Sequence, residues 1–318
     1  MKSLIVGANG QIGTELTKTL NKLYGKDNVV IADIRENKES QNTFYLLDAT
    51  DKDAVRRILT EEGIDTVFLM AAILSAKAEE IPMKAWHVNM DALFTALELA
   101  REGHIKKLFW PSSIAVFGPH TPKKNTPQFT VTDPDTVYGI SKLAGERWAE
   151  YYFERYKVDV RSVRYPGIIS WKTPPGGGTT DYAVEIFHAA LKGETFVSYI
   201  APDERLPMMY IDDAIDATVR LMEADGEKLR IRSSYNLAGF SVTPAELAEG
   251  IRRYIPGFHI EYRPDFRENI AATWPDSIDD SYAREDWNWQ HRFGLDEMIR
   301  EMLTQMQRHF YPESELIL

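Results

Sequence analysis

Short apolar runs and amphipathic helical patterns alternate along the first half of the chain. The apolar runs predict buried strands at residues 1–6, 28–32, 44–46, 66–70, 107–110 and 160–164. Apolar residues at helical spacing predict a helix from about residue 11, helices near 51–61 and 80–101, and one around Tyr138. Repeated strand–helix units imply an α/β fold with a doubly wound parallel sheet and helices on both faces.

Beyond Tyr165 this rhythm changes. Segment 166–180 is rich in proline, glycine and threonine, which predicts a shaped loop. Later helices are predicted near 212–224, 244–254 and 295–310, with short strands between them. This pattern fits a smaller α/β lobe that covers the ligand crevice and supplies a substrate pocket.

Residues that can carry chemistry gather at the predicted strand ends. In an open parallel sheet the ligand crevice lies at the carboxyl ends of the strands. Gly7, Asp33, Met70, Ser112 and Tyr165 each stand at such an end. We therefore expect these five residues to meet around one ligand.

The first strand runs into a glycine-rich turn, Gly7-Ala-Asn-Gly10-Gln-Ile-Gly13, and then into a helix. Glycines let the backbone approach a diphosphate, and the free N–H groups of the helix start bind its charge. Asp33 follows the second strand, where an acid accepts hydrogen bonds from an adenosine ribose and repels a 2′-phosphate. NAD is therefore favoured over NADP, although Arg35 stands close enough to hold that phosphate.

Tyr138 and Lys142 are four residues apart, so they share one helix face. A tyrosine hydroxyl has a reference pKa of about 10, too high for a base near neutral pH. A nearby ammonium group favours the phenolate and brings the pKa toward the working range. This spacing of tyrosine and lysine often arises by chance. It indicates a catalytic site here because Ser112 and Ser113 stand at a nearby strand end, where their hydroxyls can orient a substrate oxygen.

Composition excludes several classes of protein. The formal net charge of −11 over 318 residues argues against a nucleic-acid or anionic-membrane partner. The absence of cysteine excludes disulfides and thiolate chemistry, and the seven histidines are scattered, so no metal site is expected. The start reads as a strand rather than a leader, and no run reaches transmembrane length. A cytoplasmic protein is expected.

In this order, the glycine turn, the acid after strand two, Ser-Ser-x-x-Val-Phe-Gly and Tyr-x-x-x-Lys resemble the extended short-chain dehydrogenase/reductase superfamily. The resemblance implies a Rossmann-type domain, bound NAD and a serine–tyrosine–lysine centre. Tyr138 would be the general base and Lys142 would bind the nicotinamide ribose. Ser113, favoured by its spacing to Gly118, or else Ser112 would polarise the substrate oxygen. We expect an NAD-binding domain over 1–165 with about 206–237, and mainly a substrate-binding lobe over 166–318.

The same resemblance implies further cofactor contacts. Gln11 and Ile12 would lie at the diphosphate and Asp48 near the adenine. The remaining positions would follow the cofactor to its nicotinamide side: Met70, Ala71, Ala72, Asn89, Tyr165, Gly167 and Ile168.

Segments 164–170, 175–183 and 274–287 are similar to the short-chain-type L-threonine 3-dehydrogenases. This implies NAD-dependent oxidation of the threonine side-chain hydroxyl to 2-amino-3-oxobutanoate without a metal. Thr179 and Thr180 would hold the carboxylate or else simply cap a helix. Ser75 would contact the ammonium or carboxylate group, and Trp274 would close the pocket or belong to the core.

Two other functions remain open at this point. A nucleotide-sugar epimerase of the same superfamily would share every cofactor motif, and Arg205 is its evident diphosphate ligand. A non-catalytic NAD-binding regulatory protein would usually have lost the tyrosine or lysine.

The resemblance also implies a homodimer through a four-helix interface made by 80–101 and 137–156. Asp279 and Asp280 are expected at the solvated surface.

Overall fold

A six-stranded parallel sheet forms the centre of the computed structural model, which describes residues 2–172 and 176–312. Its strands run in the order β3-β2-β1-β4-β5-β7, and every neighbouring pair is parallel. The strands are β1 (Ser3–Val6), β2 (Val29–Asp33), β3 (Phe44–Leu46), β4 (Thr66–Leu69), β5 (Lys107–Phe109) and β7 (Asp159–Arg161). The predicted doubly wound α/β fold is confirmed.

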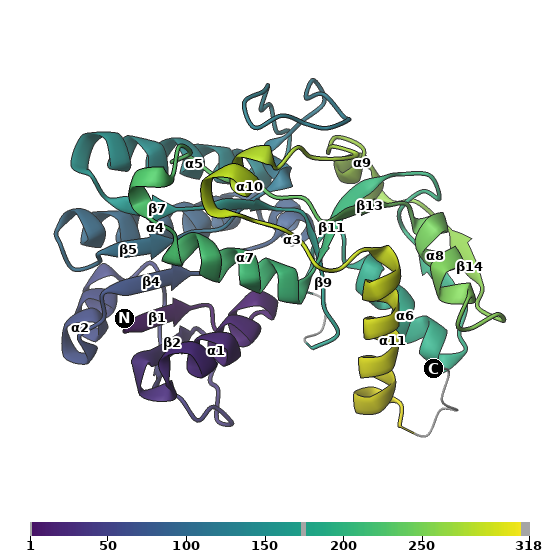
Figure 1. Cartoon of the computed structure of the whole chain (residues 1–318), viewed down its shortest axis with the longest axis horizontal. Helices are drawn as coiled ribbons and strands as arrows, with labels where there is room; N and C mark the ends of the chain where they lie inside the picture. The colour runs from purple at the N-terminus through teal and green to yellow at the C-terminus, as the bar shows by residue number, and fades with distance from the viewer. Residues whose placement is uncertain (1, 173–175, 313–318) are drawn as a thin grey trace.

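Helices cover both faces of this sheet (Figure 1). Alternate strand residues belong to different cores: Ile5 packs with α1 (Gln11–Tyr24) and α7 (Ile211–Glu223). Its neighbours Leu4 and Val6 pack with the helices of the opposite face, which are α2 (Lys52–Glu62), α4 (Pro82–Arg101) and α5 (Val137–Tyr156). Because both faces of each strand are buried, the strands read as continuous apolar runs rather than alternating ones.

Smaller elements, mostly from the second half of the chain, complete the molecule (Figure 1). Two three-stranded sheets are made by β6 (Ser112–Ser113), β8 (Val163–Tyr165) and β12 (Tyr235–Asn236), and by β9 (Gly167–Ile169), β11 (Leu206–Tyr210) and β13 (Phe240–Val242). β10 (Phe196–Ser198) pairs with β14 (Ile260–Tyr262). The helices here are α6 (Tyr182–Lys192), α8 (Pro244–Arg252), α9 (Phe266–Ala271), α10 (Ser281–Trp287) and α11 (Leu295–Phe310).

Two details differ from the sequence-based expectations. The single strand predicted at 160–164 is two strands, because β7 pairs with β5 whereas β8 pairs with β6. The prediction that Asp280 is solvated is wrong, because its side chain is buried. Its carboxylate accepts hydrogen bonds from the indole of Trp289 at 2.9 Å and from Arg284 at 2.6 Å, which offset the cost of burial.

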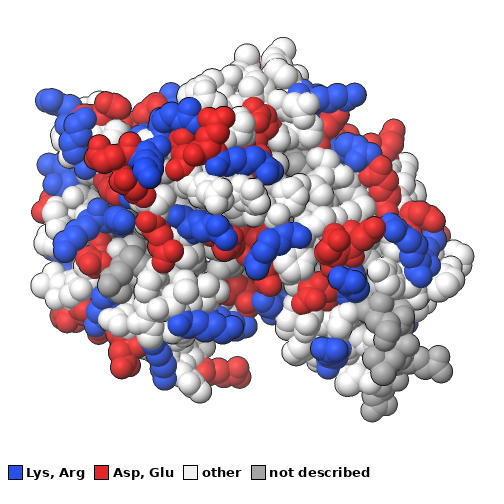
Figure 2. All heavy atoms as spheres, viewed as in Figure 1, with Lys and Arg blue, Asp and Glu red and all other residues white. Residues whose placement is uncertain are grey.

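The surface is mixed in charge. Figure 2 shows Lys and Arg side chains interspersed with Asp and Glu over the visible face. Many of these charges are paired, as Arg230 is with Glu285 and Asp286. Across residues 2–172 and 176–312, no helix combines the length and the apolar character that crossing a membrane requires.

Candidate active site

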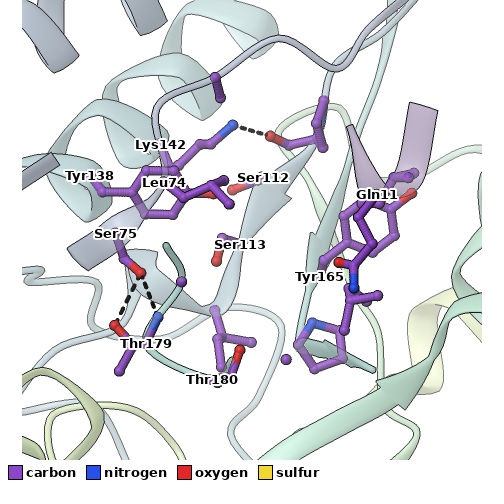
Figure 3. Close-up of a pocket in the computed structure, with 18 of the residues that line it drawn as sticks. Gln11, Leu74, Ser75, Ser112, Ser113, Tyr138, Lys142, Tyr165, Thr179 and Thr180 are labelled. Carbon is purple, nitrogen blue, oxygen red and sulfur yellow. Dashed lines mark hydrogen bonds between the residues drawn. The ribbon is translucent and has the colours of Figure 1, made fainter. Parts of the chain in front are cut away.

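A cavity of about 230 Å³ opens at the carboxyl ends of the parallel strands. It brings together residues that are far apart in the sequence, from both halves of the chain (Figure 3). The predicted cofactor and catalytic residues that line it are Gly7, Gly10, Gln11, Ile12, Gly13, Met70, Ala72, Ser112, Ser113, Tyr138, Lys142, Tyr165, Gly167 and Ile168. The predicted substrate residues that line it are Ser75, Thr179, Thr180 and Trp274.

The glycine turn leaves no room for a side chain at Gly7 or Gly13. Gly7 has a φ of 88°, and a Cβ there would lie 2.6 Å from the backbone nitrogen of Ala71. A Cβ on Gly13 would lie 2.3 Å from the carbonyl oxygen of Gly7. Helix α1 begins directly after Gly10 without a side-chain cap, so the N–H groups of its first turn are available to a ligand. This turn fits the diphosphate of a dinucleotide.

Asp33 is held against the same turn. Its carboxylate accepts hydrogen bonds from the backbone N–H groups of Asn9 and Arg35, both at 3.0 Å. The Arg35 guanidinium lies 3.6 Å from the carboxylate, but its side chain points largely into solvent. The acid therefore occupies the place where a ribose hydroxyl would be bound, which fits NAD.

Tyr138 and Lys142 stand one turn apart on α5, which begins at an N-cap where Thr136 accepts a hydrogen bond from the backbone N–H of Gly139. The Lys142 ammonium donates to the carbonyl oxygen of Pro111 at 2.6 Å. It also lies 5.5 Å from the centre of the Tyr138 ring. Burial raises the pKa of Tyr138 to about 12, against a smaller lowering by hydrogen bonding with Ser113. Burial lowers the pKa of Lys142 to about 7.

The two serines have different partners. Ser112 is buried, and its hydroxyl donates to the Glu146 carboxylate at 2.6 Å. The Ser113 hydroxyl accepts from the backbone N–H of Ala115 at 3.2 Å and lies beside Tyr138 in the cavity. Because Ser112 is committed to Glu146, Ser113 is the serine that is free to contact a substrate oxygen.

Two further hydroxyl groups line the same cavity. The Ser75 hydroxyl lies 3.0 Å from that of Thr179 and accepts from the Thr179 backbone N–H at 3.2 Å. Ser75 opens a short helix, α3 (Ser75–Glu80), that the sequence did not predict. Trp274 is buried and lines the same cavity, so it belongs both to the core and to the cavity lining.

Sequence reasoning missed Asp181, which also lines the cavity. Its carboxylate accepts hydrogen bonds from the backbone N–H groups of Gly177 and Gly178, both at 2.8 Å. Burial raises the pKa of Asp181 against these bonds. The sequence could have indicated Asp181 by its position directly after Thr179 and Thr180 in a glycine-rich loop. Pro175, which opens that segment, lies outside the described residues.

Five predicted cofactor residues do not line the cavity as described: they are Asp33, Arg35, Asp48, Ala71 and Asn89. Asp48 accepts hydrogen bonds from the N–H and hydroxyl of Thr50. Asn89 exchanges hydrogen bonds with the backbone of Ile73 at 2.8 and 3.1 Å, so it shapes the loop that carries Ala72. Within the described ranges, no group of three His, Asp or Glu side chains is placed to hold a metal ion.

Comparisons with known proteins agree with this geometry. The family described as NAD dependent epimerase/dehydratase matches residues 3–238. A relative from Staphylococcus haemolyticus, described as an uncharacterised epimerase/dehydratase, is 47% identical over 309 residues, covering 96% of this chain and 97% of the relative.

Solved structures of L-threonine dehydrogenases are also similar. The GalE-like enzyme of Cupriavidus necator in its holo form is 54% identical, with a TM-score of 0.95 over 96% of this chain and all of the other. A monomeric L-threonine 3-dehydrogenase from a metagenome is 44% identical, with a TM-score of 0.94 over 96% of this chain and 99% of the other. The chain thus belongs to the NAD dependent epimerase/dehydratase family, in the extended short-chain dehydrogenase/reductase superfamily, and its cofactor is NAD.

Proposed function

We propose that this chain is an L-threonine 3-dehydrogenase that oxidises the side-chain hydroxyl of threonine to a ketone, giving 2-amino-3-oxobutanoate. One observation carries the proposal: a single small cavity brings Tyr138 and Ser113 together with Ser75 and Thr179, whose hydroxyls lie 3.0 Å apart. The first pair suits an alcohol that must lose a proton. The second pair suits the charged groups of an amino acid.

In this proposal, Tyr138 as phenolate accepts the proton of the threonine hydroxyl. Ser113 donates a hydrogen bond to the same oxygen and so fixes the direction of proton transfer. Lys142 stabilises the phenolate by its positive charge, close to the ring. NAD, when bound, supplies the hydride acceptor. The backbone N–H groups ahead of α6, near Thr180, receive the substrate carboxylate.

Cofactor binding and substrate binding are assigned mainly to different parts of the chain. In the proposal, residues 1–165 with about 206–237 bind NAD, and residues 166–318 mainly supply the substrate wall. Helix α7 supports this assignment of 206–237, because it packs against α1 on the central sheet.

The epimerase alternative is weaker on the geometry. Arg205, its candidate diphosphate ligand, pairs with Glu246 and donates to the carbonyl oxygen of Ser241 at 3.1 Å. Of the residues described around the cavity, the basic one is Lys142. A pocket for a sugar diphosphate needs more positive charge than this. A purely regulatory NAD-binding role is disfavoured because Tyr138, Lys142 and Ser113 are all present and meet.

Incubation of the purified chain with NAD and L-threonine is expected to form NADH, followed by its absorbance. L-allo-threonine, which differs only in configuration at the reacting carbon, is the matched control and should react far more slowly, since its hydroxyl points away from Tyr138 and Ser113. No NADH from threonine together with conversion of a UDP-sugar would show that the epimerase alternative is correct.

We expect the chain to form a homodimer through α4 and α5, and this remains a prediction because one similar enzyme is described as monomeric. Trp148 and Tyr151 on α5 are 40% and 47% exposed, and Trp148 packs edge-on against Phe94 of α4 at 5.1 Å. A double variant, Trp148→Glu with Tyr151→Glu, should shift the mass in light scattering from dimer to monomer. Phe129→Glu, in the loop before α5, is the exposed aromatic control. A parent chain that is monomeric at every concentration contradicts the interface.

A further inference from the structure

The loop between Ser113 and Tyr138 does more than join the two sides of the reacting centre. It leaves the strand end at Ser113, projects from the molecule beside α9, and returns at the start of α5 (Figure 1). On the way it runs along residues 274–279 of the second half of the chain. The backbone N–H of Thr126 donates to the carbonyl oxygen of Ser277 at 2.9 Å, and Thr126 bridges to Ile278 in parallel.

Lys123, in this loop, makes hydrogen bonds to four residues of the segment around Trp274. Its ammonium donates to the carbonyl oxygens of Ala272 and Trp274 at 2.5 and 2.8 Å. Its own carbonyl oxygen accepts from the N–H groups of Asp276 and Ser277 at 2.8 and 3.2 Å. Both ends of one residue therefore hold the same short turn.

The turn that Lys123 holds contributes Trp274 to the lining of the cavity. Trp274 is 4% exposed and lines the cavity that Ser113 and Tyr138 also line. Ala272 is the C-cap of α9, so a positive charge at its carbonyl oxygen also complements the negative end of that helix. An ammonium group that donates to two carbonyls makes charge-assisted hydrogen bonds, which are stronger than neutral ones.

We propose that Lys123 is a positioning residue: by holding the Ala272 and Trp274 carbonyls, it presses Trp274 against the substrate pocket and sets how large the side chain of a β-hydroxy amino acid can be. This inference rests on the proposed dehydrogenase function. This role also accounts for the length of the loop between Ser113 and Tyr138, because the loop connects these two residues to Trp274, which limits the size of the pocket.

The test is Lys123→Met, which keeps the apolar stem and removes the donors. We expect the KM for L-threonine to rise about tenfold, the loss expected for charge-assisted hydrogen bonds, while kcat and the KM for NAD stay near the parent values. The kcat/KM for 3-hydroxynorvaline, which is one methylene longer, should rise relative to that for threonine. Lys124→Met, at the exposed neighbour, is the control, and Lys123→Arg, which keeps donors, should largely restore the parent KM.

Three results would overturn the inference. The first is an unchanged KM for threonine and an unchanged selectivity in Lys123→Met, and the second is an equal rise of the KM values for threonine, 3-hydroxynorvaline and NAD. The third is a KM for threonine in Lys123→Arg that stays as high as in Lys123→Met. Hydrogen exchange of segment 272–279 reads the same contacts without any substrate. Faster exchange there in Lys123→Met than in Lys124→Met supports the inference, and equal exchange refutes it. A parent chain that does not oxidise threonine refutes the proposed function instead, and the exchange measurement then still decides the role of Lys123.

Discussion

Replacement of Tyr138 by phenylalanine is expected to lower kcat for threonine oxidation by about 10²- to 10⁴-fold, the usual contribution of a general base. The variant keeps the buried ring and loses only the hydroxyl that would accept the proton. NAD binding should be unchanged, because the glycine turn and Asp33 do not contact this hydroxyl in the structure. Steady-state kinetics and titration of NAD fluorescence quenching measure the two effects separately.

The pH dependence gives a second test of the same residue. Burial places the pKa of Tyr138 at about 12 and that of Lys142 at about 7, so the pair holds two protons below pH 7 and one between these values. The active arrangement, phenolate beside ammonium, contains one proton. The parent kcat/KM is therefore expected to rise as the pH increases through about 7. A Tyr138→Phe variant that keeps the parent rate and this rise would show that Tyr138 is not the base.

Glu146→Gln is expected to lower the free energy of unfolding by about 3–5 kcal/mol, because it leaves a buried arginine without its counter-charge. Glu146 is fully buried on α5, and Arg164 on β8 donates to both of its oxygens at 2.8 and 2.7 Å. Arg164 also donates to the carbonyl oxygen of Gln128 and to the side chain of Asn236, at 3.1 and 3.0 Å. Urea denaturation followed by circular dichroism measures the loss.

Glu150→Gln provides the matched control, one turn farther along the same helix. Its partner Arg147 lies 2.9 Å away, but both side chains are exposed, so the change should cost at most about 1 kcal/mol. Adding Arg164→Met to Glu146→Gln removes both buried charges and should recover part of the lost stability. Equal unfolding midpoints for Glu146→Gln and Glu150→Gln would mean that the buried pair stabilises the fold no more than the exposed pair does.

The sequence predicted the central sheet well because strands buried on both faces leave uninterrupted apolar runs, as at Val29–Asp33. It did not predict α3, since Ser-Ala-Lys-Ala-Glu-Glu has no apolar periodicity. That helix depends on distant contacts instead. The Glu79 carboxylate accepts a hydrogen bond from the backbone N–H of Val137, and the Ser75 hydroxyl bonds to Thr179.

The candidate site shows the same limit at the level of single residues. The motifs located Tyr138, Lys142 and the serine pair, because their spacing is local. They favoured Ser113 over Ser112 only by its spacing to Gly118. They could not show that the Ser112 hydroxyl bonds to Glu146, because that residue lies 34 positions later in the chain. The contact of Lys123 with Trp274 spans 151 residues and is visible only in the folded chain.

The order of these cavity residues in the sequence has an evolutionary consequence. Ser113, Tyr138 and Lys142 lie within thirty residues of one another, whereas Thr179 and Trp274 stand on later segments. Changes in those later segments can therefore remodel which molecule is recognised while the groups that would move the proton are inherited intact. A chain organised in this way can acquire a new specificity without passing through an inactive ancestor.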